Sequence, residues 1–306
     1  MADPFEQISD ALTVGSYRMG SLIARLTPGF VAQGASSLLA PGIALSLRDK
    51  RSMIERHMRR IDPVISRLAL RQASQQAFDS YMRYYAESFR LPNLSSKYVD
   101  RMFTVDGYDH IERGLERGKG VILALPHLGG WEWAGRWMAD KGHRMTVIVE
   151  PLQPPELFEW FADLRRSLGM NVVPLGPDAG TEVLKALRAN EVVCLLCDRD
   201  IQRNGVEVSF FGEKTTLPAG PAMLGLRAEA VVLPTAVYFT SRVDGHHAVV
   251  RPPLRMERQG GLRETVARVT QDLAGELEGL IRRAPEQWHL FQPNWPSDPG
   301  YDEVGQ

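Results

Sequence analysis

The alternation of short apolar runs with helix-like stretches after about residue 118 constrains the fold of this chain most. Four runs rich in β-branched residues, GVILALP, MTVIVE, NVVPLG and VVCLLCD, are separated by helix-like stretches near 131–141, 155–168 and 180–189. Two more strand-like runs follow at 230–239 and 246–253, and a last amphipathic helix covers about 262–283. Strands that alternate with helices are typical of an α/β fold. We therefore expect a central mixed, mostly parallel sheet flanked by helices.

Residues 1–100 are predicted to be helical and to form an N-terminal cap on this sheet. An aromatic stripe at spacings of three and four, Phe78, Tyr81, Tyr85 and Phe89, indicates one face of a helix that packs against the core. The chain shows no internal repeat and no long linker. The simplest organisation is one compact unit, with a helical region over 1–100 and an α/β domain over 101–306.

Residues 26–47 form an uncharged stretch that Arg25 and Arg48 bracket. Several prolines and glycines break it, so one continuous spanning helix is not expected there. Two interpretations remain open, a buried helical hairpin or a surface that dips into a bilayer. The acidic start, MADPFEQ, lacks the pattern of a signal peptide, and no window of some twenty residues is apolar enough to span a membrane.

Composition excludes some function classes. The 306 residues are 44% hydrophobic and 24% charged, with a net charge of −1, which argues against nucleic-acid binding as the main activity. The 36 basic residues comprise thirty arginines and only six lysines. A GC-rich genome explains this bias, and arginines that grip phosphates bidentately are the alternative.

The two cysteines, Cys194 and Cys197, form a C-x-x-C, a spacing that is typical of redox and metal sites. They lie, however, in a short apolar run that is predicted to be a buried strand. Side chains three apart on a strand point to opposite faces, so the thiols are not expected to meet. No second cysteine pair completes a zinc site, and we expect no metal.

The segment LPHLGGWEWAG at 125–135 carries the clearest chemical signal. His127 follows an apolar strand at its carboxyl end, where ligands collect in open α/β sheets. Gly129 and Gly130 permit a tight turn whose amides approach a substrate. Glu132 falls in the first turn of the next helix, and we expect it to accept a hydrogen bond from the imidazole. A histidine oriented in this way is a general base.

Several enzyme signatures are absent from the sequence. It contains no G-x-S-x-G, no H-E-x-x-H, no P-loop and no G-x-G-x-x-G motif. A base without a nucleophile suits direct transfer, in which the hydroxyl of an acceptor itself attacks the donor.

Three separated blocks give the chain a specific resemblance. HLGGWE, the segment at 197–234 and RAPEQWHLFQPNW at 283–295 resemble, in the same order, blocks of the bacterial lipid A lauroyl/myristoyl acyltransferase family. Within it, LPHLGGWEWAG, VVCLLCDRD, GVEVSFFGE and QPNWPSD look closest to the actinobacterial phosphatidylinositol mannoside acyltransferases. The resemblance covers about 105–295 and implies a glycerolipid-acyltransferase-like fold.

The resemblance also suggests roles for individual residues. His127 is similar to the catalytic base and Glu132 to the acid of the H-x-x-x-x-[D/E] motif. The CDRD block falls where the mannoside enzymes carry a second catalytic carboxylate, and Asp198 and Asp200 both qualify because two residues apart on a strand they share a face. Glu150 and Arg165 match positions that line the substrate site in the family. The alternative interpretation of Glu150 is a charge at a strand end, and that of Arg165 is a residue on a solvated helix face.

The implied activity is transfer of a long acyl chain from acyl-CoA to a mannose hydroxyl of a membrane glycolipid. It needs no cofactor, with acyl-CoA as co-substrate. It places the protein peripherally on the cytoplasmic face of the cell membrane, and we expect the helical region over 1–100 to dock there without spanning the bilayer. The same chemistry on lipid A or a lysophospholipid is one alternative. The other is a lipid-binding protein that transfers nothing, although such a carrier needs neither His127 nor Glu132.

Overall fold

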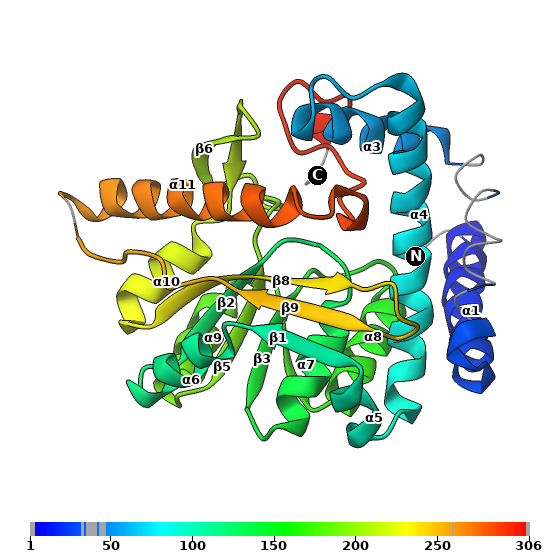
Figure 1. The fold of residues 1–306 in the computed structure, drawn as a ribbon, viewed down its shortest axis with the longest axis horizontal. Helices are drawn as coiled ribbons and strands as arrows, with labels where there is room; N and C mark the ends of the chain where they lie inside the picture. The colour runs from blue at the N-terminus through cyan, green and yellow to red at the C-terminus, as the bar shows by residue number, and fades with distance from the viewer. Residues whose placement is uncertain (1–3, 32–33, 35–41, 43–46, 259, 304–306) are drawn as a thin grey trace.

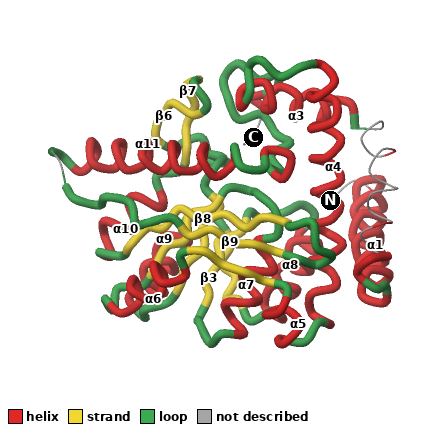
Figure 2. Tube along the Cα trace, viewed as in Figure 1, coloured by secondary structure: helices red, strands yellow, loops and turns green. Residues whose placement is uncertain are grey.

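A computed structural model describes residues 4–31, 34, 42, 47–258 and 260–303. Its centre is a seven-stranded sheet in the order β1-β9-β8-β2-β5-β3-β4 (Figures 1 and 2). The β8–β9 pair is antiparallel and every other neighbouring pair is parallel. The predicted α/β fold with a mixed, mostly parallel sheet is confirmed.

The strands of this sheet are short except for one. They are β1 (Phe103–Asp106), β2 (Val121–Leu125), β3 (Met145–Val149), β4 (Met170–Pro174), β5 (Val192–Leu196), β8 (Val231–Phe239) and β9 (His246–Val250). The central strands β2 and β8 are buried along their whole length, which explains their largely apolar sequences. A separate antiparallel hairpin consists of β6 (Val206–Phe210) and β7 (Glu213–Leu217).

Helices precede the sheet and connect its strands. The longer ones are α1 (Pro4–Leu26), α3 (Arg48–Ile61), α4 (Arg67–Arg90), α8 (Pro155–Ser167) and α11 (Leu262–Ile281). The shorter ones are α5 (Ser96–Arg101), α6 (Tyr108–Glu116), α7 (Trp131–Asp140), α9 (Ala179–Arg188) and α10 (Gly220–Ala228). Every strand and helix expected after residue 118 is present, with ends that shift by a few residues. The sequence analysis did not anticipate β1, α6, the β6–β7 hairpin or α10.

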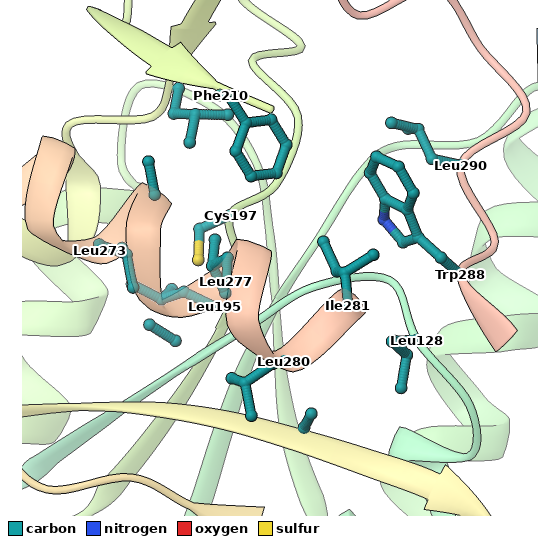
Figure 3. Packing of buried hydrophobic residues seen from close by; sticks show 14 of the residues in the cluster. Leu128, Leu195, Cys197, Phe210, Leu273, Leu277, Leu280, Ile281, Trp288 and Leu290 are labelled. Atoms are coloured by element: carbon teal, nitrogen blue, oxygen red, sulfur yellow. The ribbon is translucent and has the colours of Figure 1, made fainter. Parts of the chain in front are cut away.

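Two hydrophobic clusters cover the two faces of the sheet. Alternate β2 residues separate between them, with Ile122 and Ala124 in one cluster and Leu123 in the other. The first cluster includes the apolar face of α11, whose Leu273, Leu277 and Ile281 meet strand and loop residues in Figure 3. The second includes the buried sides of α5, α6 and α7. Strand alternation therefore gives the sheet two separate cores.

The long helix α4 stands at one end of the sheet with α1 beside it (Figure 1). The predicted aromatic stripe lies on α4, and its first member, Phe78, is buried in the core as expected. Its other members, Tyr81, Tyr85 and Phe89, line a cavity between α1, α4 and the C-terminal segment together with Phe78. The stripe thus both packs against the core and borders an open space.

Most of the uncharged stretch 26–47 lies outside the described residues, so the choice between a buried hairpin and a membrane surface stays open there. Among the helices that the structure describes, none has the length and apolar character needed to cross a bilayer.

Candidate active site

The register between two neighbouring parallel strands brings the central residues of the site together. β2 and β5 are paired with Leu125 opposite Leu196. His127 and Asp198 each lie two residues beyond this last pair, at the same edge of the sheet. The prediction that His127 follows a strand at its carboxyl end is confirmed, and its partner comes from the adjacent strand.

His127 and Asp198 form a tight pair. The imidazole Nδ1 lies 2.6 Å from Asp198 Oδ1, and the His127 backbone N–H donates to Asp198 Oδ2 over 3.0 Å. The His127 side chain keeps 23% of its surface exposed, whereas the Asp198 side chain is fully buried. An ionised carboxylate only accepts hydrogen bonds, so the imidazole nitrogen that faces it must carry a proton. In the neutral imidazole the proton is therefore on Nδ1, and Nε2 has the free lone pair.

The buried carboxylate of Asp198 is kept ionised by its neighbours. Burial by itself raises the pKa of this group, but the charge of His127 and hydrogen bonds from His127 and Trp288 outweigh burial and leave the pKa below its ordinary value. The Trp288 indole N–H donates to Oδ2 over 2.6 Å, and the side-chain amide of Asn294 donates to the Asp198 carbonyl over 3.0 Å. A fixed negative charge at Nδ1 stabilises an imidazolium.

The expectation that Glu132 accepts a hydrogen bond from the imidazole was wrong. Glu132 does lie in the first turn of α7, as predicted, but its Oε1 accepts hydrogen bonds from Arg165 and Tyr84. The Arg165 contacts measure 2.9 Å from Nε and 2.6 Å from Nη2, and the Tyr84 hydroxyl lies at 3.0 Å. The helix turn directs Glu132 toward α8 and α4, while the loop after β5 supplies the imidazole partner.

Glu132 and Arg165 form a buried ion pair next to the dyad of His127 and Asp198. Burial would lower the pKa of Arg165, and the charge of Glu132 reverses that effect and raises it. Burial and the same carboxylate raise the pKa of Tyr84, so its phenol stays protonated and donates. The interpretation of Arg165 as a solvated helix-face residue is excluded, because its side chain is only 17% exposed.

The glycine pair does not offer its amides to a substrate, which corrects a second expectation. The Gly129 N–H donates to the Gln287 carbonyl over 3.0 Å, and the Gly130 N–H donates to the Val237 carbonyl over 3.2 Å. Gly129 has a φ of +62°, and a Cβ there would collide with the carbonyl of Val237. The glycines are needed for close packing of the loop against β8.

The two aspartates of the CDRD block lie in different environments. Both follow the end of β5, so the expectation that they share a strand face was wrong. Asp200 accepts a hydrogen bond from the Gly205 N–H over 2.8 Å and shapes a turn. Of the two aspartates, Asp198 is the one that contacts His127. Glu150 pairs with Arg199, a residue for which the sequence analysis had proposed no role.

Three other residues near the dyad were not anticipated individually. Trp288 and His289 belong to the 283–295 block, which the family resemblance identified without assigning roles, and Tyr84 belongs to the aromatic-rich part of α4. The His289 N–H donates to the His127 carbonyl over 2.7 Å. Burial, and then the nearby His127, lower the pKa of His289 to about 3, so this imidazole is neutral. The sequence signal for all three was an aromatic or histidine ring alone, which does not distinguish a site from a core.

The cysteines lie on opposite sides of the sheet, as the strand pattern predicted. Cys197 packs in the first core cluster and Cys194 against the second, and both thiols are free. Burial raises the pKa of Cys194 to about 12. Within the described ranges, no group of three or more histidine, cysteine or acidic side chains is arranged to hold a metal ion.

An apolar cavity opens beside the dyad, between the sheet and α7. Trp131, whose ring centroid lies 5.9 Å from that of His127, lines the cavity at this end. Strand residues such as Leu125 and Leu196 form one wall, and the far part is lined by Phe103, Tyr108, Met138, Met145 and Met170. Glu132 and Arg165 are the only charged residues among its described lining. The arrangement suits a long hydrocarbon chain with a polar reacting end.

Comparison with known proteins identifies the family. Residues 12–297 match the sequence profile described as bacterial lipid A biosynthesis acyltransferase. The chain belongs to this family. It is 35% identical over 301 residues to a phosphatidylinositol mannoside acyltransferase of Mycobacterium tuberculosis (strain CDC 1551 / Oshkosh), covering 97% of the chain and 92% of the relative.

Two further relatives are informative. A phosphatidylinositol mannoside acyltransferase of Mycolicibacterium smegmatis is 38% identical over 222 residues, or 72% of the chain and 71% of the relative. A lipid A biosynthesis acyltransferase of Haemophilus influenzae is 27% identical over 198 residues, covering 63% of the chain and 59% of that protein. The protein is therefore an acyltransferase, which removes the alternative of a lipid carrier without catalytic activity.

Proposed function

We propose that this acyltransferase moves a long-chain fatty acyl group from acyl-CoA to a mannose hydroxyl of a phosphatidylinositol mannoside. The observation that carries the proposal is the His127–Asp198 dyad, which contacts Trp131 in the lining of an apolar cavity whose charged residues are Glu132 and Arg165. The names and high coverage of the mycobacterial relatives favour a mannoside acceptor over lipid A or a lysophospholipid.

The dyad supports direct transfer by general-base catalysis. His127 Nε2 takes the proton of the acceptor hydroxyl while the hydroxyl oxygen attacks the thioester carbonyl carbon. Asp198 holds the Nδ1 proton and stabilises the imidazolium that forms. The C–S bond then breaks, and the thiolate leaves and recovers the proton from Nε2. No acyl-enzyme intermediate is needed, because the acceptor itself is the nucleophile.

The developing charge on the carbonyl oxygen needs hydrogen-bond donors. The amides of Gly129 and Gly130 are already used, so they do not serve this role. The first turn of α7 begins at Trp131, and the amides at a helix N-terminus carry positive partial charge. The Trp133 amide already donates to the Gly130 carbonyl, so we assign the oxyanion to the amides of Trp131 and Glu132, with the charge of Arg165 close by.

Docking on the inner face of the cell membrane belongs to the same proposal, because a glycolipid acceptor keeps its tails in the bilayer. The C-terminal half of α1 supports it, since large apolar side chains are exposed there, Leu22 to 56% and Ile23 to 59%. Arg25 lies beside them in the last turn. A basic residue near anionic headgroups contributes about 1 kcal/mol. In the sequence, the uncharged stretch at 26–47 follows directly after these residues.

Vesicle co-sedimentation tests the docking. A first variant with Leu22→Glu and Ile23→Glu should lose binding to anionic vesicles, and wild-type binding should weaken with salt. A second variant with Leu38→Glu and Leu39→Glu examines the uncharged stretch. A matched control carries Val64→Glu and Leu68→Glu, because these apolar side chains are also exposed, to 90% and 78%, but lie between and at the start of other helices. Equal binding by the first two variants and the control would place the membrane contact elsewhere.

The activity test uses purified protein and radiolabelled palmitoyl-CoA with three acceptors in parallel: a phosphatidylinositol mannoside, a lipid A precursor and a lysophospholipid. Chromatography should show label transferred to the mannoside, and His127→Ala should lower the rate at least about 10²-fold while the protein stays folded. Transfer to another acceptor alone would replace the mannoside in the proposal. Transfer by His127→Ala at more than about a tenth of the wild-type rate would remove the general base.

A further inference from the structure

The C-terminal segment 285–298 contacts the dyad at three points, although none of its residues faces a substrate in the mechanism above. The Trp288 indole donates to Asp198 Oδ2, the Asn294 amide donates to the Asp198 carbonyl, and the His289 N–H donates to the His127 carbonyl. This segment thus holds the side chain of the aspartate and the backbone of both dyad residues.

Trp288 determines which carboxylate oxygen is available to the imidazole. Its N–H and the His127 backbone N–H both donate to Oδ2, over 2.6 Å and 3.0 Å. Oδ1 therefore remains for Nδ1 at 2.6 Å. A hydrogen bond to an ionised group is short and strong, so two donors on one oxygen fix the rotation of the carboxylate.

Trp288 is itself held by packing. It is 2% exposed and lies in the first core cluster. Its ring contacts the rings of His57, Phe211 and Trp295 at centroid distances of 5.5, 5.7 and 6.4 Å. Figure 3 shows the indole between Leu290 and the end of α11 at Ile281. A donor on so rigid a support keeps its direction when the substrate binds.

The segment is also fixed at its far end. Asp298 accepts hydrogen bonds from the backbone N–H groups of Asn294 and Trp295 and from Arg56 and Arg60 of α3. His57 of the same helix lies 3.5 Å from the Asp298 carboxylate. The turn that carries Asn294 is therefore tied to α3, which restricts movement of the whole segment.

We propose that Trp288 is a positioning residue that orients the Asp198 carboxylate and, through it, the Nδ1 proton of His127. The inference rests on the proposed function, because it assigns Trp288 a role through the general base. Removal of the indole N–H frees the carboxylate to rotate, so a smaller fraction of His127 carries its proton on Nδ1. The chemical step slows, and substrate binding is unaffected.

The first test compares Trp288→Phe with Trp295→Phe. Both tryptophans are buried, and the Trp295 indole donates to the backbone carbonyl of Phe210 rather than to the dyad. We expect Trp288→Phe to lower kcat about tenfold with KM unchanged, as loss of one hydrogen bond to a charged group predicts. Trp295→Phe should lose a similar amount of thermal stability and keep its kcat. A kcat loss of the same size in both variants would make Trp288 a packing residue only.

A double-mutant cycle and a spectroscopic measurement complete the test. In an Asp198→Asn background, Trp288→Phe should cost no further activity, since its effect passes through the carboxylate. The downfield imidazole proton of His127, assigned by its loss in His127→Gln, should shift or vanish in Trp288→Phe and stay in place in Trp295→Phe. Additive losses, or an unchanged resonance in both, would overturn the proposal.

Two features keep the result clear. The resonance is measured without substrate, so a protein that fails to acylate any acceptor still reports whether Trp288 orients the dyad. If Trp288→Phe does not fold, 3-benzothienylalanine at this position keeps the indole shape and lacks the N–H. An unchanged resonance with this residue would equally overturn the proposal.

Discussion

Asp198→Asn is the substitution that examines the dyad most directly. Two donors, the Trp288 indole and the His127 backbone N–H, converge on Oδ2. An asparagine must place its carbonyl oxygen there, because the opposite orientation would aim an amide N–H at both donors. Its NH₂ group then faces His127 Nδ1, which has to accept, and the proton moves to Nε2. The nitrogen that should take the hydroxyl proton is no longer basic.

The expected loss follows from this change of tautomer. The same exchange in a serine-protease triad lowers kcat about 10⁴-fold with the geometry intact, and we expect a decrease on the order of 10³–10⁴-fold here. The assay is kcat with saturating palmitoyl-CoA and mannoside acceptor, together with circular dichroism and thermal unfolding. Asp200→Asn is the matched control, since an asparagine oxygen also accepts from the Gly205 N–H. A kcat for Asp198→Asn within tenfold of wild type, or an equal loss in Asp200→Asn, would refute the reasoning.

Four further predictions concern the site and its cavity. Glu132→Gln leaves the buried Arg165 charge without its partner, so we expect a loss of about 3–5 kcal/mol in the free energy of unfolding, measured with urea. Arg165→Lys should lower kcat, because one ammonium cannot replace the two guanidinium contacts to Glu132 Oε1. Because the pKa of His289 falls from an ordinary 6.5 to about 3, the stability it contributes is complete above pH 6.5 and lost as the pH falls toward 3. His289→Gln should therefore reduce the pH slope of the unfolding free energy by up to about 1.36 kcal/mol per pH unit in that window. A Cβ at Gly135 would lie 2.6 Å from Met170 Cε in the cavity wall, so Gly135→Leu should lower kcat/KM for palmitoyl-CoA more than for octanoyl-CoA, and an unchanged ratio of the two would argue against this cavity as the acyl site.

The strands that were predicted are those whose burial dictates their composition. β2 and β8 are covered on both faces, and their residues are apolar with the exception of Thr235. The strands that were not predicted are four or five residues long and mix exposed with buried positions, as in FTVD of β1 and EKTTL of β7. A half-exposed strand of this length carries too few apolar positions to differ from a loop.

The partner of His127 could not be found from the sequence, because it depends on which strands are neighbours. His127 and Asp198 are 71 residues apart, and nothing local to either one indicates that β2 pairs with β5. Once the order is known, the register explains the contact, since both residues extend two positions beyond Leu125 and Leu196. The family resemblance had reached the CDRD block but left two aspartates open. The structure distinguishes them, because Asp198 contacts His127 whereas Asp200 accepts from the Gly205 N–H.

The H-x-x-x-x-E spacing therefore does not mark a hydrogen-bonded pair, although His127 and Glu132 are close in sequence. Only four residues separate His127 from Glu132, but the intervening loop packs its glycines against β8 and the helix turn then directs Glu132 toward Arg165 and Tyr84. The motif joins two neighbouring parts of one site. His127 belongs to the dyad with Asp198, to which we assign proton transfer, and Glu132 fixes a buried cation in the lining of the apolar cavity. That division explains why Glu132→Gln is expected to affect stability more than the basicity of His127.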